Sequence, residues 1–240
     1  MLLFPTLDLV AFAWFCGVWL AYSAILEWTD YGAQSLNSQA NRFRSAWIEE
    51  VSTRDVRIAD TQIMASLHSG AAFFASASLI GLGGVLNVFG PSSELLNTLA
   101  SLPFGTHTTP QQWEAKIIGL VIIFAYAFLK FAWSYRLFIY AAIMMGAMPP
   151  ANEQGTPRAQ DYTDRTAQLA QEAACHFNRG QRALIFALGY LGWFVHPVLF
   201  IAMTIAVAIA QWRREFTSSS SRIIKKQVPA KGQLEPPQRR

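Results

Sequence analysis

Apolar residues along the chain fall into four long blocks separated by polar stretches. The blocks cover residues 6–26, 69–88, 117–148 and 183–212. A helix needs about 20 residues to cross a hydrocarbon core of about 30 Å, so the first two blocks match one span each. The third and fourth exceed this length, and we expect them to tilt, kink or protrude. The pattern predicts an all-α integral membrane bundle: four transmembrane helices with helical connections, in residues 1–212.

Composition agrees with a membrane protein whose first block is a permanent span. Only 14% of the residues are charged, against about 25% in soluble domains. No Lys or Arg precedes Arg42, so the basic segment that opens a cleaved signal peptide is missing. Neither cysteine has metal-ligand spacing, and we expect both thiols to be free.

The positive charge of the chain is concentrated after the fourth block. The formal net charge is +4, and residues 213–240 hold eight basic and two acidic residues. We predict that these residues form a basic disordered tail, which contacts anionic lipid headgroups. The tail has one aromatic residue and no recognisable fold, so nucleic acid is not an expected partner.

The first connection, residues 27–68, contains a helical pattern. Its apolar stripe has four-residue spacing and consists of Phe43, Trp47 and Val51. This spacing predicts an amphipathic helix that either continues into the second span or lies along the interface and then turns. Glu50 and Arg54 have the i,i+4 spacing of an ion pair within one helix.

The third connection, residues 149–182, also contains a helical pattern. Two prolines at its start end the third span. A helix is expected to begin near Asp161 or Thr163, with Asp161 and Arg165 as an i,i+4 pair. Gly180 is a plausible C-cap for this helix.

The positive-inside rule does not decide the orientation. The first and third connections hold four Arg each, the tail holds eight basic residues, and residues 90–114 hold none. With four spans the termini share a side. We expect the protein to lie in the cell membrane, a bacterial inner membrane. Both termini should face outside and the first and third connections the cytoplasm, because the uncharged N-terminal segment crosses the membrane easily. If the fourth block instead folds back at His196-Pro197, every strongly basic segment becomes cytoplasmic.

Lys130 and Arg136 are basic residues inside the third block, where a charge costs at least about 2.5 kcal/mol. Six residues apart, they lie about 240° apart around a helix axis and face different directions. One interpretation is an anion-binding or coupling site inside the bundle. In the alternative, Arg136 extends to the interface, and Lys130 pairs with a carbonyl group or with a neighbour such as Glu27.

His196 lies midway along the fourth block, directly before Pro197. A buried His there either ligates haem, relays protons, or hydrogen-bonds a carbonyl group that the proline leaves free. Haem b needs a second axial ligand at similar depth. None of the other three histidines is predicted to lie mid-membrane, so we predict no cofactor.

Two clusters in the connections combine Arg with Asn. The first contains Arg42 and Arg44, and the second contains Arg179 and Arg182. Guanidinium groups suit lipid phosphates or the acidic side chains of the first connection. We predict headgroup contact or docking between the connections rather than catalysis.

Several motifs resemble those of one known family. They are Asn41-Arg42-Phe43-Arg44 with Trp47, Phe73-Phe74-Ala75-Ser76, Trp133-Ser134-Tyr135-Arg136 with Tyr140, Phe177-Asn178-Arg179-Gly180 with Arg182, and Gly192-Trp193-Phe194 with Pro197. In this order they are similar to the bacterial and plant membrane proteins grouped as domain of unknown function 599, although Ala77 stands where that family more often has Thr. The resemblance implies a multi-pass membrane protein with no assigned activity. No catalytic or binding residue is carried over from it.

The sequence favours a non-enzymatic accessory or organising subunit of the membrane. It contains no phosphate loop, zinc motif or nucleophile elbow. The small residues of the second block predict close helix packing rather than a ligand site. A homo-oligomer or another membrane protein is a possible partner. The alternatives are a small oligomeric transporter or channel with Lys130 near its pathway and, third, a haem protein or other membrane enzyme.

Overall fold

The computed structural model describes residues 4–90, 94, 96, 98, 101 and 108–225, and this part of the chain is helical throughout, without strands. The α-helices are α1 (Thr6–Trp28), α2 (Leu36–Ser52), α3 (Ile58–Asn87), α5 (Pro110–Gly146), α6 (Pro157–Tyr190), α7 (Pro197–Trp212) and α8 (Ser219–Lys225). Four short segments join them: the 3-10 turns η1 (Gly32–Gln34), η2 (Ala151–Glu153) and η3 (Leu191–Phe194), and the π-helical η4 (Arg213–Thr217). The predicted all-α class is confirmed.

Four segments are long and apolar enough to cross a membrane. They are Thr6–Trp28, Ile58–Asn87, Pro110–Gly146 and Pro197–Ile224. The first three contain most of the first three apolar blocks, and α3 and α5 begin before their blocks do. The prediction of a four-span multi-pass membrane protein is therefore confirmed, but the fourth span starts at Pro197.

The fourth apolar block, predicted as residues 183–212, is two helices rather than one. α6 begins in the third connection, where Thr156 caps it, and continues to Tyr190. After η3, His196 is extended (φ −157°, ψ 140°) and Pro197 opens α7. Proline lacks an N–H and its ring disfavours a helical conformation at the preceding residue, so the chain turns back here. The fold-back variant is thus the one observed, and the prediction of a single long span is wrong.

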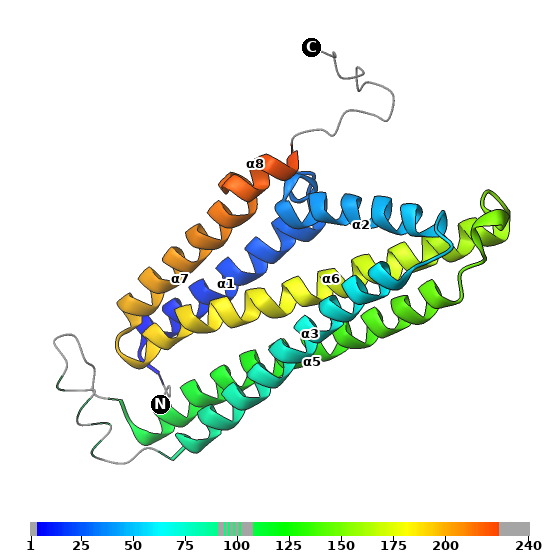
Figure 1. The fold of residues 1–240 in the computed structure, drawn as a ribbon. Helices are drawn as coiled ribbons and strands as arrows, with labels where there is room; N and C mark the ends of the chain where they lie inside the picture. The colour runs from blue at the N-terminus through cyan, green and yellow to red at the C-terminus, as the bar shows by residue number, and fades with distance from the viewer. Residues whose placement is uncertain are drawn as a thin grey trace, which may run out of the picture.

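The helices lie along one common axis with two distinct ends. We call one the N-terminal end, with residues 4–5, 88–90, 108–109 and 191–196, and the other the basic end, with residues 29–57, 147–156 and 213–225. α1, α5 and α7 run from the N-terminal end to the basic end, and α3 and α6 run back (Figure 1).

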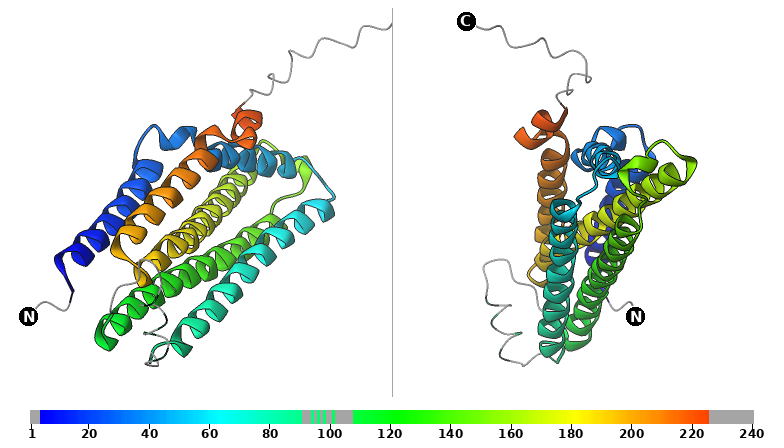
Figure 2. Two further views of the ribbon diagram at one scale, coloured as in Figure 1. Left: turned by 90° about the vertical axis from the view of Figure 1, so that its left-hand side faces the viewer. Right: turned by 45° about the vertical axis from the view of Figure 1, so that its right-hand side comes forward.

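This arrangement changes the expected topology. Because α6 is a fifth helix along the axis, α1 starts at one end while α8 lies at the other (Figure 2). The expectation that both termini share a side of the membrane counted four crossings, and it stays a prediction. Residues 213–225 of the predicted disordered tail are helical, and residues 226–240 lie outside the described part of the chain.

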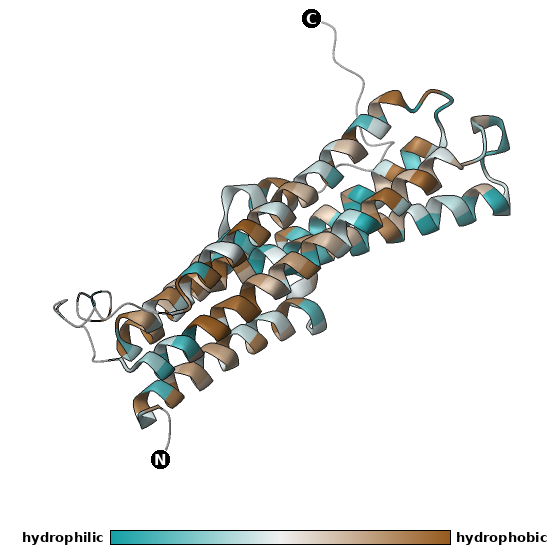
Figure 3. Cartoon of the chain, turned by 90° about the horizontal axis from the view of Figure 1, so that it is seen from below, coloured by the Kyte–Doolittle hydropathy of each residue, from teal (hydrophilic) through white to brown (hydrophobic). Residues whose placement is uncertain are grey.

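Two apolar clusters hold the helices together. Aromatic rings fill the cluster between α1, α5, α6 and α7, where Phe15, Phe186 and Phe200 are at most 2% exposed. The second cluster joins α2, α3, α5 and α6 around Ile48 and Met145. Figure 3 shows hydrophobic and hydrophilic residues mixed along the helices. The sequence of α6 is polar at its start in the third connection and apolar toward Tyr190.

Gly180 lies inside α6 and does not cap it. A Cβ atom at this position would meet the Phe131 ring of α5 at 2.8 Å. Real Cβ contacts are almost never this short, so the glycine permits the close approach of α5 and α6. The interpretation of Gly180 as a C-cap was wrong. The need for glycine at this position comes from the packing of α5 on α6, which the local sequence pattern does not contain.

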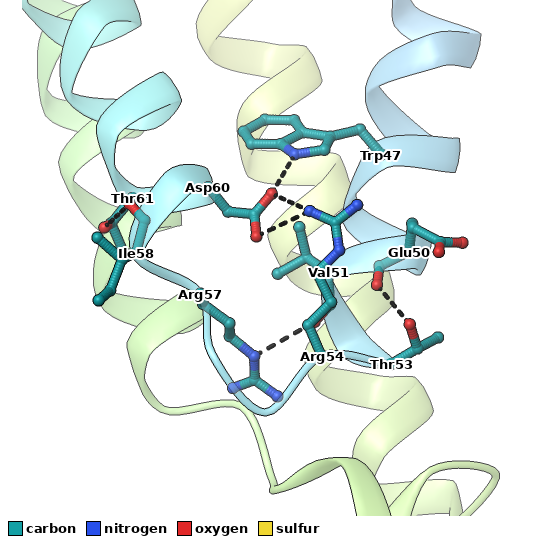
Figure 4. Close-up of polar contacts among 9 residues, drawn as sticks. All are labelled: Trp47, Glu50, Val51, Thr53, Arg54, Arg57, Ile58, Asp60 and Thr61. Carbon is teal, nitrogen blue, oxygen red and sulfur yellow. Dashed lines mark hydrogen bonds and ion pairs between the residues drawn. The ribbon is translucent and has the colours of Figure 1, made fainter.

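The first connection is broken between α2 and α3. Arg54 donates to both carboxylate oxygens of Asp60, at 2.8 and 3.1 Å, instead of pairing with Glu50 (Figure 4). The indole of Trp47 donates to the same carboxylate at 2.9 Å. Arg57 donates to the carbonyl oxygens of Val51, Met148 and Pro149. These bonds tie the α2–α3 turn to the end of α5.

Candidate functional site: a cationic groove near the basic end

Lys130 and Arg136 lie on different faces of α5, as their spacing predicts. The Lys130 ammonium lies 5.2 Å from the Tyr126 ring centroid, on the face toward α1. Arg136 is exposed, donates to the Tyr140 hydroxyl at 2.8 Å, and lies over the rings of Trp133 and Tyr140. The two cations therefore do not form one site.

Glu27, near the end of α1, binds two arginines of α6. Arg179 donates to it through Nε and Nη2, at 3.0 and 2.8 Å. Arg182 donates through Nη2 to Glu27 Oε1. This double pairing fixes α1 against α6 near the basic end. It also occupies the carboxylate that the sequence offered to Lys130, and Lys130 forms no ion pair with any residue that the structure describes.

A groove of ≈ 530 Å³ opens between α1 and α5. Its α1 wall contains Cys16, Trp19, Leu20 and Glu27, and its α5 wall contains Ile122, Ile123, Tyr126 and Lys130. Arg179 of α6 lines it as well. The rings of Trp19 and Tyr126 meet across the groove at 6.1 Å between centroids. The groove thus combines apolar walls with cations.

A second cavity, of ≈ 370 Å³, lies between α6 and the start of the first connection. Asn41 and Cys175 line it, with the Asn41 amide 3.8 Å from the Cys175 sulfur. Arg44 donates to the Asn41 side chain, and burial lowers the pKa of its guanidinium. Arg42 is exposed. The four arginines predicted as headgroup contacts therefore differ: three take part in the packing of α2, α6 and α1, and one faces outward.

The N-terminal end holds a buried polar cluster that the sequence analysis did not single out. Lys116, 2% exposed, donates to the Trp193 carbonyl at 2.8 Å and lies 3.7 Å from Asp8 Oδ1. The Trp193 indole donates to the same Asp8 oxygen at 2.7 Å. These bonds join α1, α5 and η3. An acidic residue inside the first apolar block was the available signal.

His196 lies at the N-terminal end, far along the axis from the Lys130 groove. Its Nδ1 accepts a hydrogen bond from the Val198 amide at 3.1 Å, so the side chain caps α7. The described residues contain no group of three or more His, Cys, Asp or Glu side chains that could hold a metal ion. The three candidate intramembrane polar residues, Lys130, Arg136 and His196, thus contact different partners and lie apart from one another.

A model of a family described as protein of unknown function, DUF599, matches residues 10–220. The chain belongs to the DUF599 family. This match confirms the resemblance drawn from the sequence motifs. No curated protein and no solved structure matches the chain.

The family assigns no activity, so the chemistry of this DUF599 chain has to be argued from its own side chains. Two of the motifs that carried the resemblance make structural contacts. Asn41 and Arg44 bind each other, and the two arginines of the second cluster bind Glu27. The groove between α1 and α5 differs from them because its Lys130 has no ion-pair partner among the described residues and lies beside open volume. A cation beside an apolar surface is chemically suited to an anion that carries an apolar group.

Proposed function

We propose that this DUF599 chain is a non-enzymatic protein of the cell membrane with its basic end in the cytoplasm. There it contacts anionic lipid headgroups and acts as an accessory or organising subunit. The observation that carries the proposal is the separation of charge between the two ends. Residues 29–57 and 213–225, at the basic end, contain four Lys or Arg each, whereas residues 88–90, 108–109 and 191–196, at the N-terminal end, contain none.

Cytoplasmic connections of membrane proteins carry an excess of Lys and Arg. The fold-back at His196-Pro197 brings the basic segments of this chain to a common end, because α8 lies beside α2. In a four-span arrangement, the first and third connections together hold as many basic residues on one side as the tail holds on the other. The fold-back removes this tie. Basic residues beside a cytoplasmic leaflet are also attracted to its anionic lipids, by about 1 kcal/mol per residue.

Thiol labelling tests the orientation. In a variant with both native cysteines replaced by Ser, we introduce either Glu49→Cys in exposed α2 or Gln111→Cys at the exposed start of α5. A membrane-impermeant maleimide is expected to label the Gln111→Cys protein in intact cells. It should label the Glu49→Cys protein only after permeabilisation. The reverse pattern would overturn the proposed orientation.

Purification from native membranes in a mild detergent tests the accessory role. A second protein at fixed stoichiometry, or a defined homo-oligomer by light scattering, is expected. A monodisperse monomer with no companion protein would count against an accessory subunit.

A small oligomeric transporter or channel is the second candidate. One observation favours it: Lys130 has no ion-pair partner among the described residues although it lies inside a candidate span. Anion flux into proteoliposomes that Lys130→Met abolishes would support this candidate. Equal flux through empty and protein-containing vesicles would remove it.

A further inference from the structure

The two walls of the groove between α1 and α5 carry the same gradient of polarity. On α5, Ile122, Tyr126 and Lys130 follow at four-residue spacing and form one stripe. On α1, Cys16, Leu20, Ser23 and Glu27 form a matching stripe. Because α1 and α5 run in the same direction (Figure 1), both stripes change from apolar to charged toward the basic end.

The charged part of the groove has a surplus of cations. Arg179 and Arg182 share the single carboxylate of Glu27, and Lys130 is unpaired within the part of the chain that the structure describes. The four side chains together carry a formal charge of +2. Charged groups at membrane depth normally have partners, so a negative ligand group would complete this cluster.

The groove as a whole has the dimensions of a ligand site. From Ile122 to Lys130 the α5 wall rises about 12 Å. The volume of ≈ 530 Å³ falls within the range of about 300–1,000 Å³ for small-molecule sites. A hydrocarbon chain along these walls and an anionic group beside Lys130 would satisfy both parts at once.

We propose that the groove binds an anionic phospholipid from the leaflet at the basic end. Its phosphate contacts the Lys130 ammonium and the exposed edge of Arg179, whose side chain is 30% exposed. One acyl chain follows Trp19, Leu20 and Ile123 toward Cys16. The proposal does not depend on which side of the membrane the basic end faces, so it stands or falls separately from the proposed orientation.

Native mass spectrometry of the full chain tests this binding. The purified protein is mixed with phosphatidylglycerol or phosphatidylcholine of the same acyl chains. We expect the anionic lipid to remain bound at voltages that strip the zwitterionic one. The Lys130→Met protein should retain at most about one fifth as much phosphatidylglycerol as the wild type, because a charge-assisted contact is lost. The matched control is Arg136→Met, which removes an exposed cation of the same helix outside the groove and should bind as the wild type does.

A second variant and a second readout cover the case in which Lys130→Met fails to fold. Ile122→Trp, at a 62% exposed position, narrows the groove without removing charge and should also reduce retention. Bound phosphatidylglycerol should slow alkylation of Cys16, which lines the groove, but not of Cys175, which does not.

Three results would overturn the proposal. They are equal retention of both lipids, unchanged retention in Lys130→Met and Ile122→Trp, or a dimer that protects Cys16 without lipid. The last result would assign the groove to a second copy of the chain.

Discussion

The two ends of the bundle use charge in different ways. At the N-terminal end, Lys116 and Asp8 are nearly inaccessible, and the Trp193 backbone and indole complete their hydrogen bonds. At the basic end, the cations Arg54 and Arg179 are 42% and 30% exposed in their pairs with Asp60 and Glu27, although the Asp60 carboxylate itself is only 1% exposed. The first arrangement closes a cluster on itself, whereas the second keeps its cations within reach of water and headgroups.

This difference predicts where the chain depends on its charges for stability. A buried ion is expensive to leave unpaired, whereas an exposed pair contributes little because water and salt screen it. The N-terminal cluster should therefore act as a structural clamp. Substitutions at the basic end should change the stability little, but they should change what the surface binds.

The largest effect is expected at Lys116. Lys116→Met leaves the Asp8 carboxylate buried, with the Trp193 indole as its remaining partner among the described residues, and the free energy of unfolding should fall by about 3–5 kcal/mol. Unfolding in mixed micelles titrated with a denaturing detergent measures this change. The double variant Asp8→Asn/Lys116→Met should recover part of the loss. If Lys116→Met lowers the free energy of unfolding no more than Lys130→Met does, the N-terminal cluster is not a structural clamp.

A smaller effect is expected between the ends, at Gly180. Gly180→Ala forces a Cβ atom against the Phe131 ring, and overpacking of this kind costs about 1–3 kcal/mol. The matched control is Gly17→Ala, where a new Cβ has no neighbour within 4 Å and the helix gains up to about 1 kcal/mol. Phe131→Leu should relieve the strain of Gly180→Ala in the same assay. Equal stabilities of the two alanine variants would contradict the close packing of α5 on α6.

Hydropathy predicted the spans of α1, α3 and α5 because composition and length suffice there. It did not predict α6, which is polar where it leaves the α5–α6 turn and apolar near Tyr190. The residues of such a helix belong partly to a polar connection and partly to an apolar block, so a hydropathy window over either segment does not contain the whole helix. The proline at position 197 was the one local sign of the turn, and its effect depends on whether a neighbouring helix can receive the returning chain.

The candidate site was predicted only in part. Lys130 was singled out because a cation inside an apolar block is unusual, but the walls of its groove belong to α1 and α5, which are distant in sequence. Lys116 lies one residue before the third block and was not counted as buried. Glu27 was considered as a partner for Lys130, whereas α6 brings Arg179 and Arg182 to it instead. These pairings depend on how helices pack, which residue spacing along one helix does not reveal.

The smallest effect is expected at Asp60, and it tests whether charge at the basic end is structural at all. Asp60→Asn keeps an acceptor for the Trp47 indole but removes the charge that holds Arg54, which is 42% exposed. The free energy of unfolding should fall by only about 1 kcal/mol, because the arginine regains water. The α2–α3 turn should loosen locally, and trypsin should cleave after Arg54 or Arg57 faster than in the wild type.

Glu50→Gln is the matched control for Asp60→Asn, because Glu50 has the helical spacing for an ion pair with Arg54 but does not form it. Its stability should stay within about 0.5 kcal/mol of the wild type, with unchanged cleavage. Faster cleavage in Glu50→Gln than in Asp60→Asn would mean that Arg54 pairs with Glu50 rather than with Asp60. A loss above about 3 kcal/mol in Asp60→Asn would mean that this pair is as structural as the Lys116 cluster. The contrast between the two ends would then lie in how many cations each end holds, rather than in how each end uses them.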